Sequence, residues 1–329
     1  SLRPIGALRA SGRFGAGSGI RVESWPKIRP GSLIQLSGGP PLQRAGRSGR
    51  AGPGGPGRAG RAGAGGRGGY CCRVTAWRRY VAIGDSTSEG LDDPDGRGGY
   101  RGWADRFAQH VAAARPGLEY ANLAVRGKLT AEIQAEQLPV ALGLRPDLAT
   151  VVAGVNDMLR PRFDADDVTG RIGEMQAALI ATGATVLTFT MPDPVRVMPM
   201  ARPLRGRFAA YNEKLRQVSA QTGAILLDLG AHEVAGDPRL WSLDRLHANS
   251  AGHERIGYAL AWAAGLAGFD DTWSASLPPG PVRTRRQRAA AEVAWIRGHL
   301  LPWVVRHARG QSSGDGITAK RPLPSPVEA

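Results

Sequence analysis

The chain has 329 residues, of which 42% are hydrophobic, so it can bury the core of one large domain or two small ones. Its formal net charge is +15, but the excess lies at the ends: residues 1–73 carry 13 Lys and Arg side chains against one acid, whereas residues 74–273 carry 21 against 24. A mildly acidic middle without a basic surface interleaved with aromatic residues argues against a specific nucleic-acid binder.

Residues 1–73 are predicted to be a disordered basic segment. The stretch 44–69 consists of Gly, Arg, Ala, Pro and one Ser, and such a composition cannot bury enough apolar surface to offset its conformational entropy. Sequence typical of a folded domain begins abruptly at Val74. We therefore expect translation to begin at or near Val74, with 1–73 an artefact of gene calling; a genuine disordered arm is the alternative.

From residue 80 onward, short apolar runs alternate with stretches of helical periodicity. The runs are apolar throughout, as in strands covered on both faces. The alternation predicts an α/β fold over residues 74–273, a three-layer α/β/α sandwich with a flavodoxin-like, parallel five-stranded sheet. Strands are expected at 80–84, 118–125, 148–153, 184–190 and 224–229, and helices at 100–114, 129–142, 164–182, 204–222 and 250–266.

The segment 191–207 is predicted to be a long loop after the fourth strand. Its content of Pro, Met, Val and Arg suits a plain surface loop or a partly apolar rim over a site. As a rim, it would bring Met198 and Met200 to acyl chains and Arg196 or Arg202 to an anionic group.

The C-terminal part is predicted to be a basic helical extension over 274–309, followed by a disordered tail over 310–329. The helix itself is expected at 281–309, with one basic face. Five of its side chains are available for docking: Val293, Ile296, Leu300, Trp303 and Val304.

Small and polar residues follow four of the predicted strands. Because the carboxyl ends of parallel strands meet at one edge of a sheet, where ligands gather, we expect these residues to share a rim. They are Gly84, Asp85 and Ser86 after the first strand, Gly127 after the second, Gly154, Asn156 and Asp157 after the third, and Asp244 and His247 after the fifth.

These four stretches resemble the signature blocks of the SGNH/GDSL hydrolase family of GDSL-like lipases and esterases. The match is G-D-S-x-[ST]-x-G at 84–90, the second-block glycine at Gly127, G-x-N-D at 154–157 and D-x-x-H at 244–247. The blocks occur in the order of the family, and the resemblance covers roughly residues 78–268. It implies a hydrolase of ester bonds that uses a serine nucleophile and no cofactor.

The residue types in these blocks fit acyl transfer. A serine hydroxyl is a poor nucleophile at neutral pH, so Ser86 needs a base within hydrogen-bond reach. His247 suits that role because its pKa lies near neutrality, and Asp244, three residues earlier, can reach the other imidazole nitrogen to fix the tautomer. By the resemblance, the oxyanion-hole donors are the backbone N–H groups of Ser86 and Gly127 and the side-chain amide of Asn156.

Other polar residues near these blocks have simpler expected roles. Asp85 is expected to order its turn by accepting backbone N–H bonds, and Asp157 to act as a turn or cap residue. His253 is expected to be structural. A zinc site built from Asp244, His247 and His253 is disfavoured because no third strong cluster of ligands is apparent, so we predict no metal.

The adjacent Cys71 and Cys72 cannot staple a fold and lack the spacing of a metal site. No apolar run approaches the roughly 18 residues of a membrane span. No secretory signal is visible either, which makes a cytoplasmic location the default expectation. The expected partner is a small-molecule ester, and the oligomeric state is left open.

Besides a nucleic-acid binder driven by the basic ends, which is disfavoured above, three functions fit these features. The first is a serine ester hydrolase that works through an acyl-enzyme on a lipid ester, an acetylated sugar or a thioester. The second is an acyltransferase with the same residues, in which an alcohol other than water takes the acyl group. The third is a non-catalytic binding module, against which the intact Ser86, Asp244 and His247 argue.

Overall fold

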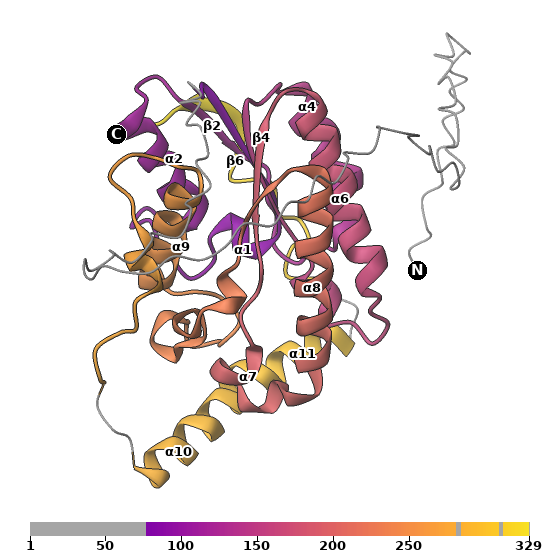
Figure 1. Ribbon diagram of the computed structural model, residues 1–329. Coiled ribbons are helices and arrows are strands. Elements are labelled where there is room, and N and C mark those ends of the chain that lie inside the picture. The colour runs from indigo at the N-terminus through magenta and orange to yellow at the C-terminus, as the bar shows by residue number, and fades with distance from the viewer. Residues whose placement is uncertain (1–76, 281–283, 309–311, 329) are drawn as a thin grey trace, which may run out of the picture. The chain divides into compact units, whose positions relative to one another are not determined.

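The computed structural model describes residues 77–280, 284–308 and 312–328, all within one compact unit that spans Gly68–Ala329. Within this unit, a single sheet is flanked by helices (Figure 1). The basic segment predicted at 1–73, the expected start at Val74 and the cysteine pair lie outside the described residues.

A six-stranded sheet has the strand order β5-β4-β3-β1-β2-β6. β1 lies between β2 and β3, and all pairs from β2 through β5 are parallel. The order 2-1-3-4-5 is that of flavodoxin-like folds, so the predicted fold class is confirmed. The five parallel strands are β1 (Arg79–Gly84), β2 (Glu119–Asn122), β3 (Leu148–Val152), β4 (Thr185–Phe189) and β5 (Ile225–Leu227).

The sixth strand, β6 (Arg321–Pro326), adds an antiparallel edge to the five predicted parallel strands. It lies within the tail predicted to be disordered over 310–329, and that prediction is wrong at these residues. It pairs antiparallel with β2 at the edge of the sheet, where Arg321 lies opposite Asn122. Three prolines in six residues favour coil in the sequence. An edge strand tolerates them because one side of its backbone needs no partner.

A lysine ties the start of β6 to helix α2 (Gly102–Ala114). Nζ of Lys320 lies 2.9 Å from Oδ1 of Asp105, and it donates to the carbonyl oxygens of Tyr100 at 2.9 Å and Arg101 at 2.6 Å. All three partners lie more than two hundred positions away in the chain. Composition alone therefore cannot reveal that this segment is ordered.

Helices cover both faces of the sheet (Figure 1). α2 packs against α9 on one face, and α6 packs against α8 on the other, beside α4. The predicted helices are confirmed with small shifts at their ends. The α- and π-helical elements of this part are α1 (Ser86–Glu89), α3 (Thr130–Glu132), η1 (Ile133–Gln137), α4 (Leu138–Gly143), α5 (Val155–Met158), α6 (Ala165–Ala181), α8 (Arg205–Thr222) and α9 (Ser250–Ala263). Short 3₁₀ helices are η3 (Leu229–Ala231), η4 (Glu233–Gly236), η5 (Pro238–Leu240) and η6 (Asp271–Ser274).

The segment 191–207 is not a plain loop, which corrects that prediction. It contains the short helix α7 (Pro194–Val197) and the 3₁₀ helix η2 (Pro199–Leu204). Each begins with a proline, whose missing N–H has no helical partner at that position anyway. Asp193 caps α7 by accepting the N–H of Val195 at 3.0 Å.

The basic extension forms the expected helix, which runs through α10 (Arg285–Trp295), the π-helical turn η7 (Ile296–Leu300) and α11 (Leu301–Ala308). Trp295 docks α10, and its side chain is 6% exposed. Val293, which was expected to dock, is 49% exposed because the face of α10 that meets the fold is centred on Trp295.

The other residues expected to dock this helix differ in burial. Ile296 and Leu300 are partly buried, whereas the side chains of Trp303 and Val304 lie outside the described part of the structure. Within the described residues, every helix falls short of the length and apolar character needed to cross a bilayer.

Candidate active site

Ser86 begins the short helix α1 directly after the central strand β1. Asp85 caps this helix by accepting the N–H of Thr87 at 3.0 Å, as expected for a residue that orders the turn. The carboxyl of Asp85 is buried, and this burial raises its pKa to about 6. Ser86 is thus held at the first position of a capped helix, where backbone N–H groups lack intrahelical partners.

The side-chain amide of Gln137 holds the end of β1. Its Oε1 accepts the N–H of Gly84 at 2.8 Å, and its Nε2 donates to the carbonyl oxygen of Gly84 at 2.9 Å. Gln137 lies in the π-helical turn η1, and such wide turns recur at functional sites. A Cβ on Gly84 would collide with Ser88 and with the carbonyl oxygen of Val152, so this close packing requires glycine. The sequence does not single out Gln137.

Three of the predicted side chains form one hydrogen-bonded series. Oγ of Ser86 lies 2.8 Å from Nε2 of His247, and Nδ1 of His247 lies 2.6 Å from Oδ2 of Asp244. The hydroxyl, the imidazole and the carboxylate follow one another in this order. His247 can therefore take a proton from Ser86 while Asp244 faces the opposite nitrogen.

The charges around His247 favour its protonated form. Burial by itself lowers the pKa of His247, but the hydrogen bond and charge of Asp244 outweigh it, with further contributions from Asp92 and Asp85, so the pKa is raised. Burial also acts to raise the pKa of Asp244, yet hydrogen bonds from His247 and Ser242 hold it well below its usual range. Asp244 is therefore ionised, as it must be to stabilise an imidazolium.

The loop that carries Asp244 and His247 is closed on itself. Trp241 and Ala248 form an isolated antiparallel bridge at its base. Oδ1 of Asp244 accepts the N–H groups of Leu246 at 2.8 Å and His247 at 3.0 Å. One carboxylate oxygen thus binds the backbone of the loop, and the other is left for the imidazole.

Asp92 and Ser242 lie behind this pair, although the sequence does not single them out. Oγ of Ser242 is 2.5 Å from Oδ2 of Asp92 and 2.6 Å from Oδ1 of Asp244. Oδ2 of Asp92 is 4.0 Å from Nδ1 of His247. The hydroxyl has one proton and donates to one carboxylate at a time. Aspartates in turns are common, so the pattern at 91–95 carries no signal of this role by itself.

Gly127 lies in the loop that follows β2. Contacts from α1 hold this loop in place. Glu89 at the end of α1 accepts the backbone N–H of Arg126 at 2.8 Å and pairs with its guanidinium. Gly127 has a φ of +76°, in the region that favours glycine. Within residues 77–280, 284–308 and 312–328, neither its backbone N–H nor that of Ser86 has a hydrogen-bond acceptor. Both donors can therefore serve a ligand.

Asn156 lies in α5, directly after β3 and beside the same loop. Its Nδ2 donates to the carbonyl oxygen of Lys128 at 3.0 Å and approaches Oδ2 of Asp85 at 3.4 Å. The longer contact is the weaker of the two. The fold thus brings Asn156 next to the turn of Ser86 and the loop of Gly127.

Asp157 and His253 have structural partners, in keeping with their expected roles. Asp157 accepts the N–H and the hydroxyl of Thr130 at 3.0 and 2.9 Å. Nδ1 of His253 accepts the N–H of Trp103 at 3.1 Å, and its Nε2 lies 2.9 Å from the carbonyl oxygen of Leu91. Burial lowers the pKa of His253 to about 4, so this residue stays neutral.

Among the described residues, one group of potential metal ligands occurs: Asp92, Asp244 and His247, whose ligand atoms lie within 4.8 Å of one another. His253, the third member of the disfavoured zinc site, is bonded elsewhere. Both nitrogens of His247 already face Ser86 and Asp244, so a metal at this group would interrupt the hydrogen-bonded series.

The C-terminal segment around Ser312 and Gly314 contacts the loop of Gly127. The sequence gives no indication of this contact. A Cβ on Gly127 would collide with Oγ of Ser312, and a Cβ on Gly314 would collide with the carbonyl oxygen of Arg126. The N–H of Ser312 donates to Oδ2 of Asp315 at 3.0 Å, which closes a tight turn. Glycines on both sides therefore permit this close approach.

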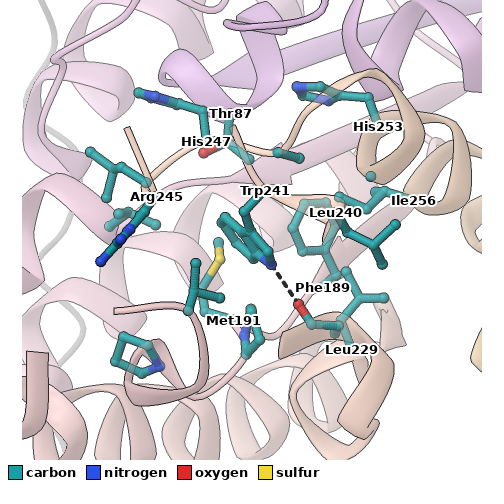
Figure 2. A pocket seen from close by; sticks show the side chains of 18 of the residues that line it. Thr87, Phe189, Met191, Leu229, Leu240, Trp241, Arg245, His247, His253 and Ile256 are labelled. Carbon is teal, nitrogen blue, oxygen red and sulfur yellow. Dashed lines mark hydrogen bonds between the residues drawn. The ribbon is translucent and has the colours of Figure 1, made fainter. Parts of the chain in front are cut away.

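An apolar pocket opens beside the hydrogen-bonded series (Figure 2). Thr87 and His247 lie at one end of the pocket and Phe189 and Leu229 at the other, with Trp241 between them. Such a pocket can hold an apolar group next to His247, whose ring bonds the hydroxyl of Ser86, although Ser86 itself does not line the pocket. Its walls include Val155, Leu159, Met191, Leu204, Phe208, Ile256 and Trp273.

Residues of the segment 191–207, which precedes and enters α8, line this pocket. Of the two interpretations of this segment, a partly apolar rim over a site therefore fits better than a plain surface loop. Met198 lines the pocket, but Met200 is 51% exposed and does not, which corrects that expectation. Arg196 pairs with Glu233 at 2.6 Å, and Arg202 is exposed. Neither arginine lines the pocket.

A hydroxyl, an imidazole and a carboxylate in series, at the carboxyl edge of a parallel sheet, form the constellation that serine hydrolases use. Residues 82–255 match the GDSL-like Lipase/Acylhydrolase family, and the chain belongs to this family. The protein is accordingly a hydrolase that acts on ester bonds. The resemblance found in the sequence is thereby confirmed.

The chain is similar to solved structures of other enzymes. A catalytic mutant of Axe2, an acetylxylan esterase from Geobacillus stearothermophilus, has a TM-score of 0.50 at 17% identity, over 61% of this chain and 97% of Axe2. LAE5, an α/β hydrolase enzyme from the metagenome of Lake Arreo, Spain, has a TM-score of 0.48 at 22% identity, over 57% of this chain and 95% of its own. No curated protein matches the chain.

Proposed function

We propose that the protein hydrolyses esters of apolar carboxylic acids through an acyl-enzyme formed on Ser86. The observation that carries this proposal is the unbroken series from Oγ of Ser86 through His247 to Asp244, at 2.8 and 2.6 Å. A serine hydroxyl attacks an ester at a useful rate only when a base accepts its proton. The series supplies that base and the anion behind it, and membership of the family supports the same reaction class.

In acylation, Oγ of Ser86 attacks the carbonyl carbon of the ester while Nε2 of His247 takes the hydroxyl proton. Asp244 faces Nδ1 and stabilises the imidazolium that forms. His247 then returns the proton to the departing alkoxide, and the alcohol leaves the acyl group on Ser86. In deacylation, His247 takes a proton from a water molecule while the water oxygen attacks the acyl carbonyl carbon. His247 then gives this proton to Oγ of Ser86 as the ester bond to the serine breaks and the carboxylic acid leaves.

Three donors are available to the oxyanion of the tetrahedral intermediate. They are the backbone N–H groups of Ser86 and Gly127 and the side-chain amide of Asn156. The oxyanion would replace the 3.4 Å contact between Asn156 and Asp85. The bond to the carbonyl oxygen of Lys128, at 3.0 Å, would meanwhile keep the amide in place.

The pocket beside His247 supports an apolar acyl group. Thr87 and His247 line the near end, and the walls beyond them are apolar, as at Leu159 and Phe189. Each CH₂ group that an acyl chain buries there contributes about 0.8 kcal/mol. An acetyl group would leave most of these walls uncovered. Of the substrates weighed from the sequence, lipid-like esters and thioesters therefore fit better than acetylated sugars.

A fluorophosphonate probe tests the nucleophile. Ser86 should be labelled covalently, and Ser86→Ala should abolish labelling and hydrolysis with an unchanged circular dichroism spectrum. Ser276→Ala, at an exposed serine, is the control and should behave as wild type. Labelling that persists in Ser86→Ala would refute this mechanism.

A series of p-nitrophenyl esters tests the acyl group. The value of kcat/KM should rise from the acetyl ester to esters of medium-length acyl chains, because the buried chain adds binding energy in the transition state. A maximum at the acetyl ester would refute the apolar preference while leaving the role of Ser86 intact.

A further inference from the structure

Helix α10 contacts the loop that carries Asp244 and His247. The indole N–H of Trp295 donates to the backbone carbonyl oxygen of Asp244 at 3.0 Å. Glu292, one turn earlier on α10, lies 2.8 Å from the guanidinium of Arg245. We propose that α10 holds this loop in its reactive conformation, with Trp295 and Glu292 as positioning residues, an inference that rests on the proposed function of the site.

Arg245 has a strained backbone conformation within this loop. Its φ is +62°, in the left-handed region that residues with a side chain seldom adopt. A residue keeps such a conformation only when its surroundings hold it there. The guanidinium of Arg245 is bonded to Glu292 and lies 4.8 Å from the centroid of the Trp295 ring. Both of these anchors belong to α10.

The hydrogen bond from Trp295 fixes the peptide that joins Asp244 to Arg245. The carbonyl of Asp244 belongs to this peptide, so its direction sets the ψ of Asp244 and the φ of Arg245 together. The carboxylate of Asp244 extends from the same residue and reaches Nδ1 of His247 at 2.6 Å. A rotation of the peptide would move these groups apart, and a misplacement of about 1 Å costs on the order of 10²-fold in rate.

Both ends of α10 are defined by local structure. At its start, Oγ1 of Thr284 accepts the N–H of Gln287 at 3.2 Å, and Oε1 of Gln287 accepts the N–H of Thr284 at 2.9 Å. At its end, the π-helical turn η7 begins directly after Trp295. Turns of this kind redirect a helix and recur at functional sites. Trp295 thus lies at the end of α10, against the loop of Asp244.

Simple burial of an aromatic ring is the competing explanation of this contact. It predicts that replacement of Trp295 lowers stability but leaves the reaction of the folded protein unchanged. A positioning role predicts that kcat falls far more than KM rises, because Trp295 does not line the apolar pocket, whereas Arg245, which it contacts, lines it in part. It also predicts a change in the pH profile, because the pKa of His247 depends on its contact with Asp244.

Variants of the full chain distinguish the two explanations. Trp295→Phe keeps a ring beside Arg245 but removes the N–H, Trp295→Leu removes both, and Glu292→Gln removes the charge. Val293→Ala, on the exposed side of α10, is the matched control. The measurements are kcat, KM and the pH dependence of kcat/KM with p-nitrophenyl butyrate, together with the melting temperature.

We expect kcat to fall about tenfold in Trp295→Phe and Glu292→Gln and about 10²-fold in Trp295→Leu, with KM within about twofold of wild type. The pKa that governs the acid limb of the kcat/KM profile, which we assign to His247, should also fall in these variants. Val293→Ala should match wild type. Unchanged kcat and pH profiles in the folded Trp295 variants would overturn the proposal, as would an equal loss in Val293→Ala. If Trp295→Leu does not fold, Trp295→Phe and Glu292→Gln decide the matter.

The NMR signal of the Nδ1 proton of His247 gives a readout that does not depend on activity. This proton is shifted downfield when it is bonded to Asp244, and the signal should weaken or move in Trp295→Phe. An unchanged signal would count against the positioning role. Persistent labelling in Ser86→Ala would instead refute the proposed function, so the two failures can be told apart.

Discussion

Oγ of Ser86 and Nε2 of His247 lie 2.8 Å apart, although 161 positions separate the two residues in the chain. Ser86 follows the central strand β1, and His247 lies in the loop before α9, so the parallel sheet brings both to the same edge. The distance is that of a direct hydrogen bond. A proton can therefore pass from serine to histidine without movement of the backbone.

Replacement of Asp244 by asparagine should lower both the rate and the pKa that governs it. His247 must be neutral to accept a proton, and Asp244 raises its pKa although burial opposes the shift. In wild type, kcat/KM should therefore fall as the pH drops through a value above the ordinary histidine pKa of about 6.5. In Asp244→Asn this pKa should decrease, and kcat should fall by about 10⁴. An unchanged acid limb would assign the shift to another group, such as Asp92.

Asn156→Ala should lower kcat far more than it raises KM. The loss of one oxyanion donor costs about 10²–10³ in turnover. Steady-state kinetics with one ester measure the effect, and the variant should retain the wild-type melting curve within a few degrees. A pure increase in KM would mean that Asn156 binds the substrate rather than the transition state.

Gln137→Glu should weaken the end of β1. A carboxylate can still accept the N–H of Gly84, but it cannot donate to the carbonyl oxygen, which then keeps only the N–H of Val125 at 3.3 Å, and the loss of one hydrogen bond costs about 0.5–1.5 kcal/mol. Urea unfolding should show this loss at pH 8. The loss should shrink as the pH falls through the raised pKa of the buried glutamate, because a protonated carboxyl can donate. Gln221→Glu, at an exposed position on α8, is the control. An equal loss in both variants would contradict the assignment.

Lys320→Met should destabilise the packing of β6 against the fold. Burial raises the pKa of Asp105, and Lys320 partly offsets that effect, so removal of the ammonium leaves a poorly compensated carboxylate. Breaking a fully buried pair costs about 3–5 kcal/mol. We expect about half of this, because the two side chains keep 20% and 25% exposure. Addition of Asp105→Asn should restore most of the free energy of unfolding, and a double variant no more stable than Lys320→Met would argue against the pair.

Gly314→Ala should disturb the loop of Gly127. The added methyl group would collide with the carbonyl oxygen of Arg126, so the tail and the loop must separate. A displaced loop misaligns the N–H of Gly127, and kcat should fall about tenfold with the fold intact. Thr318→Ala, exposed on the same segment, is the control. Wild-type kinetics in Gly314→Ala would show that the tail moves while the loop stays in place.

Local patterns predicted most of the secondary structure. The apolar run at 148–153 became β3, and the periodic stretch at 164–182 became α6, each with small shifts at its ends. Strand β6 has no such local pattern. It forms because β2 offers a free edge and because Lys320 meets Asp105, and both conditions depend on distant parts of the chain.

The site divides in the same way. Ser86, Asn156 and His247 belong to short motifs whose order can be recognised in a sequence. Gln137 and Trp295 belong to no motif, since their roles are side-chain hydrogen bonds, two from Gln137 to Gly84 and one from Trp295 to Asp244. Such a bond depends on where two separate elements meet.

Hydrophobic periodicity and motif spacing are properties of neighbouring residues, so they were enough to predict the fold class, the family and the residues of the hydrogen-bonded series. The sixth strand, the apolar pocket and the contact of α10 with the loop of Asp244 became apparent in the folded chain alone. These features arise when elements far apart in the chain pack together. Packing is governed by the shape and polarity of surfaces that exist only after folding.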